Sequence, residues 1–116
     1  MAAVKLGALK QVVQFLRAAA GDDGFSETEV FAAYGAPVRS KKEDASDGEV
    51  WRAAQVSATI TARFIVRRTI FTSGITPRDR LRCEARDYEI TGIREVAESR
   101  RRYFEMSATT EIGKRP

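Results

Sequence analysis

Hydrophobic and polar residues alternate most regularly between Val56 and Arg67. Every second side chain there is apolar, and those between are mostly hydroxyl-bearing or cationic; the apolar set is Val56, Ala58, Ile60, Ala62, Phe64 and Val66. Because successive side chains of a strand point to opposite faces of a sheet, this period of two indicates one buried and one solvated face. The pattern predicts a long, half-buried antiparallel strand over residues 56–67.

The segment 9–17 fits two kinds of element. Leu9, Val13 and Leu16 have the spacing of a helical stripe, whereas Val13 and Phe15, with the β-branched residues around them, fit a strand. We favour a strand, because the Gly-Asp-Asp-Gly sequence 21–24 then supplies the turn that follows it.

Shorter strand patterns recur along the rest of the chain. The expected strands are residues 28–34, limited by Gly35 and Pro37, residues 81–83 and 88–93, which form a hairpin across residues 85–87, and residues 103–108. Together with the long strand they predict a mainly β fold, a small antiparallel β-barrel or sandwich.

A polar connection precedes the long strand. Residues 40–45 are charged and are expected to form a loop. The Ser-x-x-Glu pattern of residues 46–49 is a capping box, which predicts one short α-helix to about residue 54. Trp51 is the largest apolar residue of that helix, and we favour a core or interface role for it over a binding platform.

Composition is that of a soluble globular domain. The 116 residues are 43% hydrophobic and 31% charged, which is enough to bury a core in a single domain, residues 1–116. We expect flexible ends, residues 1–6 and the polar tail 109–116. No apolar run approaches the ~20 residues of a membrane-spanning helix, so a cytosolic product without membrane contact is expected.

Few residues are suited to catalysis or metal binding. The chain has no histidine and a single cysteine, Cys83, which we interpret as a small buried hydrophobic residue. This removes the histidine-dependent triads and the usual zinc sites. The acid pairs Asp22/Asp23 and Asp44/Asp47 have no supporting base and are expected on the surface. We therefore predict no enzyme, no cofactor and no metal site.

The positive charge is modest. Twenty Lys and Arg residues against 16 acids give a net charge of +4. The densest basic cluster is the arginine run 100–102, for which a solvated turn between strands is favoured over a phosphate site. Arg78, Arg80 and Arg82 are two residues apart, the spacing of side chains on one face of a strand. We expect them to line a surface that contacts either acidic groups or DNA.

The order of these parts is informative beyond each pattern alone. After the first two strands, a Gly48-Glu49 helix start and the long strand come two motifs, Ile75-Thr76-Pro77-x-x-Arg80-Leu81 and Tyr88-Glu89-Ile90-x-Gly92-Ile93, and then a final strand. From about Leu6 to Ala108 this order resembles the phage head–tail joining proteins, also called head-closure, stopper or head–tail adaptor proteins.

The resemblance implies a structural, mechanical role. It implies a small β-barrel with a helix in one long connection, assembled with copies of itself as a ring between the portal or adaptor protein and the tail proteins of a tailed phage or prophage. Such a ring extends the DNA channel, with non-specific DNA contact possible there. It is built in the host cytoplasm and belongs to the virion neck.

A ring requires two different contact surfaces on each subunit. The loops expected at residues 39–47 and 70–74 are the candidates, because apolar or mobile loop residues gain order on docking. The candidate partner-interface residues are Trp51, Ile70, Phe71, Arg100, Arg101 and Arg102.

One alternative remains open, a small β-barrel that binds single-stranded nucleic acid. In such barrels aromatic rings stack on bases inside a positive groove. Some of Phe15, Tyr34, Phe64 and Tyr88 would then face solvent, and the affinity for oligonucleotides would fall steeply with salt.

Overall fold

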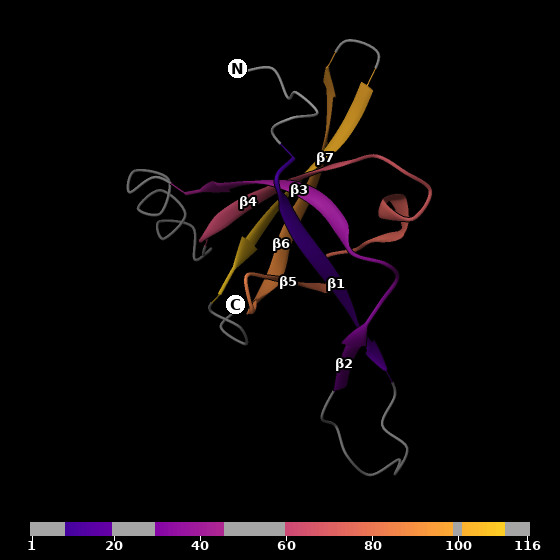
Figure 1. The fold of residues 1–116 in the computed structure, drawn as a ribbon, viewed down its shortest axis with the longest axis vertical. Helices are drawn as coiled ribbons and strands as arrows, with labels where there is room; N and C mark the ends of the chain where they lie inside the picture. The colour runs from indigo at the N-terminus through magenta and orange to yellow at the C-terminus, as the bar shows by residue number, and fades with distance from the viewer. Residues whose placement is uncertain (1–8, 20–29, 46–59, 99–100, 111–116) are drawn as a thin grey trace.

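The computed structural model describes residues 9–19, 30–45, 60–98 and 101–110, and these form an antiparallel β-barrel (Figure 1). Its strands are β1 (Gln11–Ala19), β2 (Val30–Ala33), β3 (Val38–Asp44), β4 (Ala62–Arg67), β5 (Arg80–Cys83), β6 (Arg86–Glu98) and β7 (Arg101–Thr109). The one helical element of the described residues is the 3-10 turn η2 (Thr72–Gly74). The mainly β prediction is confirmed; the helix predicted over residues 46–54 lies outside the described residues.

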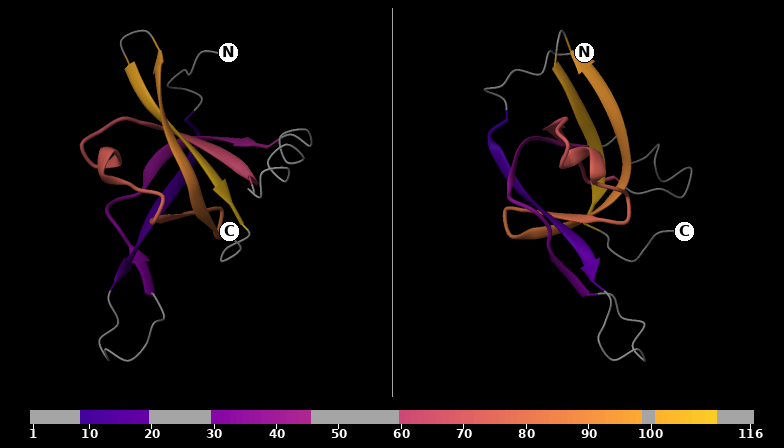
Figure 2. Two further views of the ribbon diagram at one scale, coloured as in Figure 1. Left: turned by 180° about the vertical axis from the view of Figure 1, so that it is seen from behind. Right: turned by 90° about the vertical axis from the view of Figure 1, so that its right-hand side faces the viewer.

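The barrel closes through β1. The strands follow the order β2-β1-β3-β4-β7-β6-β5, and β5 pairs in turn with β1, so that six strands form a closed barrel and β2 is an additional strand. One edge of β1 pairs with β3 and then with β2, while residues 13–16 pair with β5 on the other edge. The β1–β2 and β6–β7 hairpins project from opposite ends of the barrel (Figures 1 and 2).

The alternation in the long strand predicts its inner face correctly. Ala62, Phe64 and Val66 are all fully buried in the core, between β3 and β7. Strand β4 begins at Ala62, so the strand prediction is wrong for residues 60 and 61, and residues 56–59 lie outside the described part. The strand predicted over residues 9–17 is confirmed by β1, and the strand predicted over residues 103–108 is confirmed by β7.

The outer face of the barrel carries a second apolar cluster. Ile65, on the face predicted to be solvated, is buried with Leu9 and Tyr103. The Tyr103 side chain is 1% exposed, and its hydroxyl has no hydrogen-bond partner among the described residues. A buried donor without a partner lowers stability, because it gives up its hydrogen bonds to water.

Tyr103→Phe should therefore stabilise the protein. Removing the unpaired hydroxyl while keeping the ring is expected to raise the free energy of unfolding by about 1 kcal/mol, measured by urea denaturation. Tyr88→Phe is the matched control, because the Tyr88 hydroxyl interacts with Lys42 and its removal should not stabilise. A Tyr103→Phe protein less stable than the wild type would contradict this account.

Strand β3 corrects the loop predicted for residues 40–45. These residues pair with β1 through Ser40 and with β4 from Ser40 to Asp44. Their charges fit a strand because opposite charges two residues apart share a face: Lys41 Nζ lies 3.0 Å from Glu43 Oε1, and Lys42 Nζ lies 3.8 Å from Asp44 Oδ1. Polarity alone therefore misled the prediction. The loop expected as a contact surface at residues 39–47 is wrong for residues 39–44, which belong to β3, and residues 46 and 47 lie outside the described part.

The β5–β6 turn lies earlier than predicted. Cys83 pairs with Arg86, so the turn consists of Glu84 and Ala85 alone, at φ 53° and 62°. Two residues with positive φ form the tight turn that matches the twist of a hairpin, but it usually contains Asn or Gly. Without that signal, the sequence placed the turn at residues 85–87. Strand β6 also runs five residues beyond Ile93, to Glu98.

Three aromatic rings pack together at one end of the barrel, and we call them the aromatic cluster (Phe15, Tyr34 and Phe71). The Phe71 ring centroid lies 6.0 Å from that of Phe15 and 5.3 Å from that of Tyr34. Between β2 and β3, Gly35 adopts φ 72°, and a Cβ there would lie 2.3 Å from the Phe71 ring. A glycine at this position thus allows the loop after β4 to close over the core.

Candidate functional site

The loop after β4 holds one apolar side chain in solvent. Ile70 is 98% exposed, whereas the next residue, Phe71, packs against the core in the aromatic cluster. The two neighbouring candidates thus differ in their surroundings. Phe71 anchors the loop, and Ile70 is directed away from the barrel.

A set of short hydrogen bonds fixes this loop, which we call the Ile70 turn (residues 67–74). The Thr69 and Thr72 hydroxyls each accept the backbone N–H of the other residue, at 3.0 and 2.8 Å. The buried Thr72 hydroxyl also donates to the Arg67 carbonyl at 2.8 Å, and the Ser73 N–H donates to the Thr69 carbonyl at 2.9 Å. Such mutual capping holds Ile70 in one conformation before any partner arrives.

Three arginines lie where the Ile70 turn meets the β6–β7 hairpin: Arg67 and Arg68 in the turn, and Arg102 on β7. Arg67 and Arg68 are exposed, and the Arg68 N–H donates to the Arg102 carbonyl at 2.9 Å. The Arg102 guanidinium lies 2.8 Å from Glu95 and that of Arg68 3.4 Å from it. The hydrogen bond from Arg102, and then the charges of both arginines, lower the pKa of Glu95 despite its partial desolvation.

The structure places the remaining interface candidates only in part. Arg102 is exposed and paired with Glu95, whereas Trp51, Arg100 and the side chain of Arg101 lie outside the described residues. Ile70, Phe71 and Arg102 belong to neighbouring elements, because Arg67, the first residue of the Ile70 turn, pairs with Tyr103 of β7.

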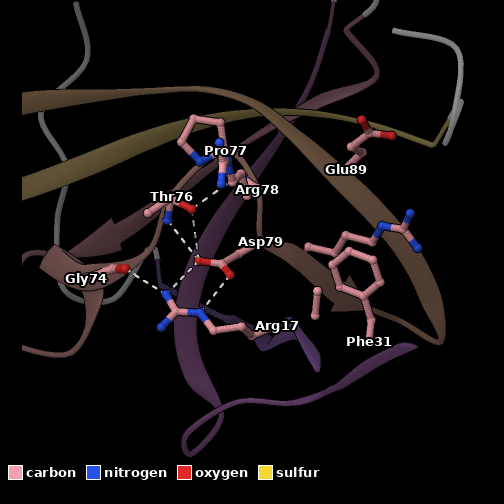
Figure 3. Close-up of a pocket in the computed structure, with 10 residues that line it drawn as sticks. Arg17, Phe31, Gly74, Thr76, Pro77, Arg78, Asp79 and Glu89 are labelled. Carbon is pink, nitrogen blue, oxygen red and sulfur yellow. Dashed lines mark hydrogen bonds and ion pairs between the residues drawn. The ribbon is translucent and has the colours of Figure 1, made fainter. Parts of the chain in front are cut away.

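A second surface is a pocket of about 680 Å³ beside Gly74, the last residue of the Ile70 turn, and we call it the Arg17 pocket (Figure 3). It lies where β5 begins beside the end of β1. The residues lining it are Arg17, Ala18, Phe31, Gly74, Thr76, Pro77, Arg78, Asp79, Arg80 and Glu89.

An ion pair forms the wall of this pocket. The Arg17 Nε and Nη2 atoms donate to the two carboxylate oxygens of Asp79, both at 2.9 Å, and Nη2 also donates to the Gly74 carbonyl at 2.8 Å. Asp79 is buried, and its Oδ2 accepts the Thr76 N–H at 2.9 Å. Burial alone would raise the pKa of Asp79, but the hydrogen bonds from Arg17 and Thr76 outweigh it and hold that pKa below its ordinary value.

Arg17 also connects the pocket to the aromatic cluster. Its guanidinium carbon lies 3.9 Å from the centroid of the Tyr34 ring. The hydrogen bond with Asp79 raises the pKa of Arg17, which therefore stays charged. Neither member of this pair is predicted from the sequence, although Asp79 stands inside the Ile75–Leu81 motif. No local pattern indicates this pair, because Arg17 and Asp79 are 62 residues apart along the chain.

Two of the three arginines expected to share one face do so: Arg80 and Arg82 alternate with the buried Leu81 and Cys83 along β5, but their partners differ. Arg80 lies on the Phe31 ring, with its guanidinium carbon 3.8 Å from the ring centroid. Arg82 forms a two-point pair with Asp87, at 2.6 and 3.2 Å. Arg78 is exposed in the turn before β5. Arg78 and Arg80 therefore line the Arg17 pocket, and Arg82 does not.

Other chemistry has little support among the described residues. Cys83 is 1% exposed, and burial raises the pKa of its thiol, as expected for a packed hydrophobic residue. No group of three potential metal ligands occurs in the described part of the chain. Of the four rings considered for base stacking, Phe15, Phe64 and Tyr88 are buried in the core, and Tyr34 is covered by Arg17.

Comparison with known families distinguishes between the two functions considered for this barrel, a phage structural role and the binding of single-stranded nucleic acid. Residues 4–111, almost the whole chain, match the family model described as phage head completion protein. The chain belongs to the phage head completion protein family. No curated protein matches the sequence.

Membership in the head completion family confirms the resemblance found in the sequence. The protein is a structural component of a phage virion with a role in head closure, which brings it into contact with other head or tail proteins at the virion neck. Within the part of the chain that the structure describes, no helix is long and apolar enough to cross a membrane.

Proposed function

We propose that this head completion protein assembles with copies of itself into a ring between the portal or adaptor protein and the tail, and that the Ile70 turn docks on a neighbouring protein of the neck. The observation that carries the docking proposal is a fully exposed isoleucine on a loop fixed by hydrogen bonds. Family membership supports the location of this contact at the virion neck.

The energetics favour Ile70 as an anchor. Complete burial of an isoleucine side chain contributes about 1.5–3 kcal/mol. Because hydrogen bonds within the Ile70 turn already hold the loop, little of this gain is lost to ordering it. The exposed Arg67 and Arg68 beside it suit a partner with an apolar pocket and an acidic rim, which guides approach and orientation.

Ring formation requires a heterologous contact between subunits. The two projecting hairpins, β1–β2 and β6–β7, lie at opposite ends of the barrel and offer two unlike surfaces for it (Figure 1). We place the arginine run 100–102 near a charged partner, either protein or DNA in the channel, and Trp51 at a packing or docking contact.

Ile70→Ser is expected to reduce attachment to the neck without affecting folding. The test mixes the protein with portal-containing capsids that lack it and measures, by electron microscopy, the fraction of capsids with ring density at the portal vertex. The variant should need at least about tenfold more protein for the same occupancy, because a buried anchor is lost. Its free energy of unfolding should change by less than about 0.5 kcal/mol, since Ile70 contributes no packing.

Val12→Ser is the matched control. Val12 is also a β-branched residue and 55% exposed, but it lies on β1 rather than on the Ile70 turn. Equal attachment by the Ile70→Ser and Val12→Ser proteins would exclude Ile70 as an anchor. A variant with alanine at positions 100, 101 and 102 tests the arginine run, and unchanged attachment by that variant would exclude it.

A further inference from the structure

Beside the Arg17 pocket, β1 has an edge that no strand of the described residues pairs with beyond Leu16. The last residue pair between β1 and β5 is Leu16 with Arg80, whereas β1 continues to Ala19 and pairs with β2 along its other edge. Phe15 accepts a hydrogen bond from the Tyr34 N–H on the β2 side. Because backbone polar groups alternate between the two edges of a strand, those of Ala18 point to the edge that β5 leaves open.

The side chains around this edge carry excess positive charge. Arg78 is exposed and forms no ion pair within the described residues, and Arg80 lies on the Phe31 ring. Asp79 is neutralised by Arg17, so Glu89, which stands opposite Arg80 in the β5–β6 register, is the remaining acid of the lining. Ala18, Phe31 and Pro77 add apolar surface.

These features favour a protein segment over nucleic acid. An open strand edge offers both N–H and C=O groups; an extended peptide can pair with both, whereas the backbone of DNA has acceptors for the N–H groups but no donors for the carbonyls. Asp79 is already paired with Arg17, so Arg78 and Arg80 are the arginines of the lining left for a ligand, too few to follow a run of phosphates. Carboxylates spaced along a peptide can instead reach Arg78 and Arg80 while apolar side chains contact Phe31.

We infer that the Arg17 pocket and the open edge of β1 at Ala18 form a docking site for an extended, acidic segment of another protein. The segment adds to β1 as a short strand next to the first residue of β5, and its carboxylates pair with Arg78 and Arg80. The inference deepens the proposed function, because the partner it describes is a neighbouring protein of the neck. Ile70 does not line this site. It is exposed to solvent four residues before Gly74, which does line it.

Titration of the isotope-labelled full chain, followed by amide NMR shifts, tests this site. The probe is a blocked peptide of alternating glutamate and valine; the same peptide with lysine in place of glutamate and a short oligothymidylate are the comparisons. The acidic peptide should shift the amides of Ala18, Phe31 and Arg78 and bind at least about tenfold more tightly than the lysine peptide.

Two variants separate the charge from the strand edge. Arg78→Glu should weaken binding of the acidic peptide about tenfold. Ala18→Pro should also weaken it, because it removes the N–H that faces the open edge and no internal hydrogen bond. Arg86→Glu is the matched control, an exposed arginine on β6 outside the pocket, and should bind the peptide as the wild type does.

Several results would overturn the inference. They are the absence of shifts at millimolar peptide, equal binding of the lysine peptide, stronger binding of oligothymidylate at the same amides, or unchanged binding by Arg78→Glu. None of them bears on the capsid experiment with Ile70→Ser. A peptide site without ring attachment, or ring attachment without a peptide site, therefore shows which proposal has failed.

Discussion

Gly35→Ala should lower the free energy of unfolding by about 3 kcal/mol. The methyl group would lie 2.3 Å from the Phe71 ring, and the left-handed backbone at φ 72° adds strain for any side chain with a Cβ. The measurement is the urea midpoint at constant m-value. Gly92→Ala is the control, because a Cβ at Gly92 meets nothing within 4 Å.

A double-mutant cycle separates the two causes of this loss. In a Phe71→Ala background the clash is absent, so Gly35→Ala should then cost only the backbone strain, about 1 kcal/mol. The same cost in both backgrounds would show that Phe71 does not pack over Gly35. Because Phe71 anchors the loop, the Gly35→Ala protein should also attach to capsids less well than its stability alone predicts.

Asp79→Asn should be the second most damaging substitution, at about 2 kcal/mol. The amide keeps an acceptor for the Thr76 N–H, but it loses the two-point ionic contact that Arg17 makes and presents an N–H₂ group to a cation. Thermal or urea unfolding measures the loss. Asp87→Asn, which removes the exposed pair with Arg82, should cost less than about 1 kcal/mol.

The Asp79 pair also predicts how stability depends on pH. The pKa of Asp79 is lowered in the folded protein, so the folded state binds fewer protons than the unfolded state as the pH falls. The stabilisation is therefore complete above the unfolded pKa of about 4, and is lost as the pH falls through the folded value. The difference in stability between wild type and Asp79→Asn should shrink below about pH 4, and a constant difference would contradict this.

The sequence predicted the parts of the fold that local patterns determine. The period of two placed Ala62, Phe64 and Val66 in the core, and it identified β1, β7 and the β5–β6 hairpin. It failed at β3, where same-face charge pairs such as Lys41 with Glu43 support a strand that polarity had indicated to be a loop. That strand is held by backbone pairing with β1 and β4, which no local pattern reports.

The candidate sites show the same division. Ile70 is recognisable in the sequence as an apolar residue in a loop, but its rigidity depends on the hydroxyls of Thr69 and Thr72 and on Phe71 finding the aromatic cluster. The Arg17 pocket depends on a contact between β1 and a distant turn, and an open edge exists only once β5 has paired. Such features follow from tertiary structure and not from spacing along the chain.

The Arg17 side chain connects three parts of the molecule. Its guanidinium contacts the Asp79 carboxylate and the Gly74 carbonyl at the end of the Ile70 turn. It also contacts the Tyr34 ring, against which Phe71 packs. The Arg17 side chain is thus one physical link between the end of β1 and the loop that bears Ile70. A substitution of Arg17 should therefore disturb the turn that holds Ile70 as well as the end of β1.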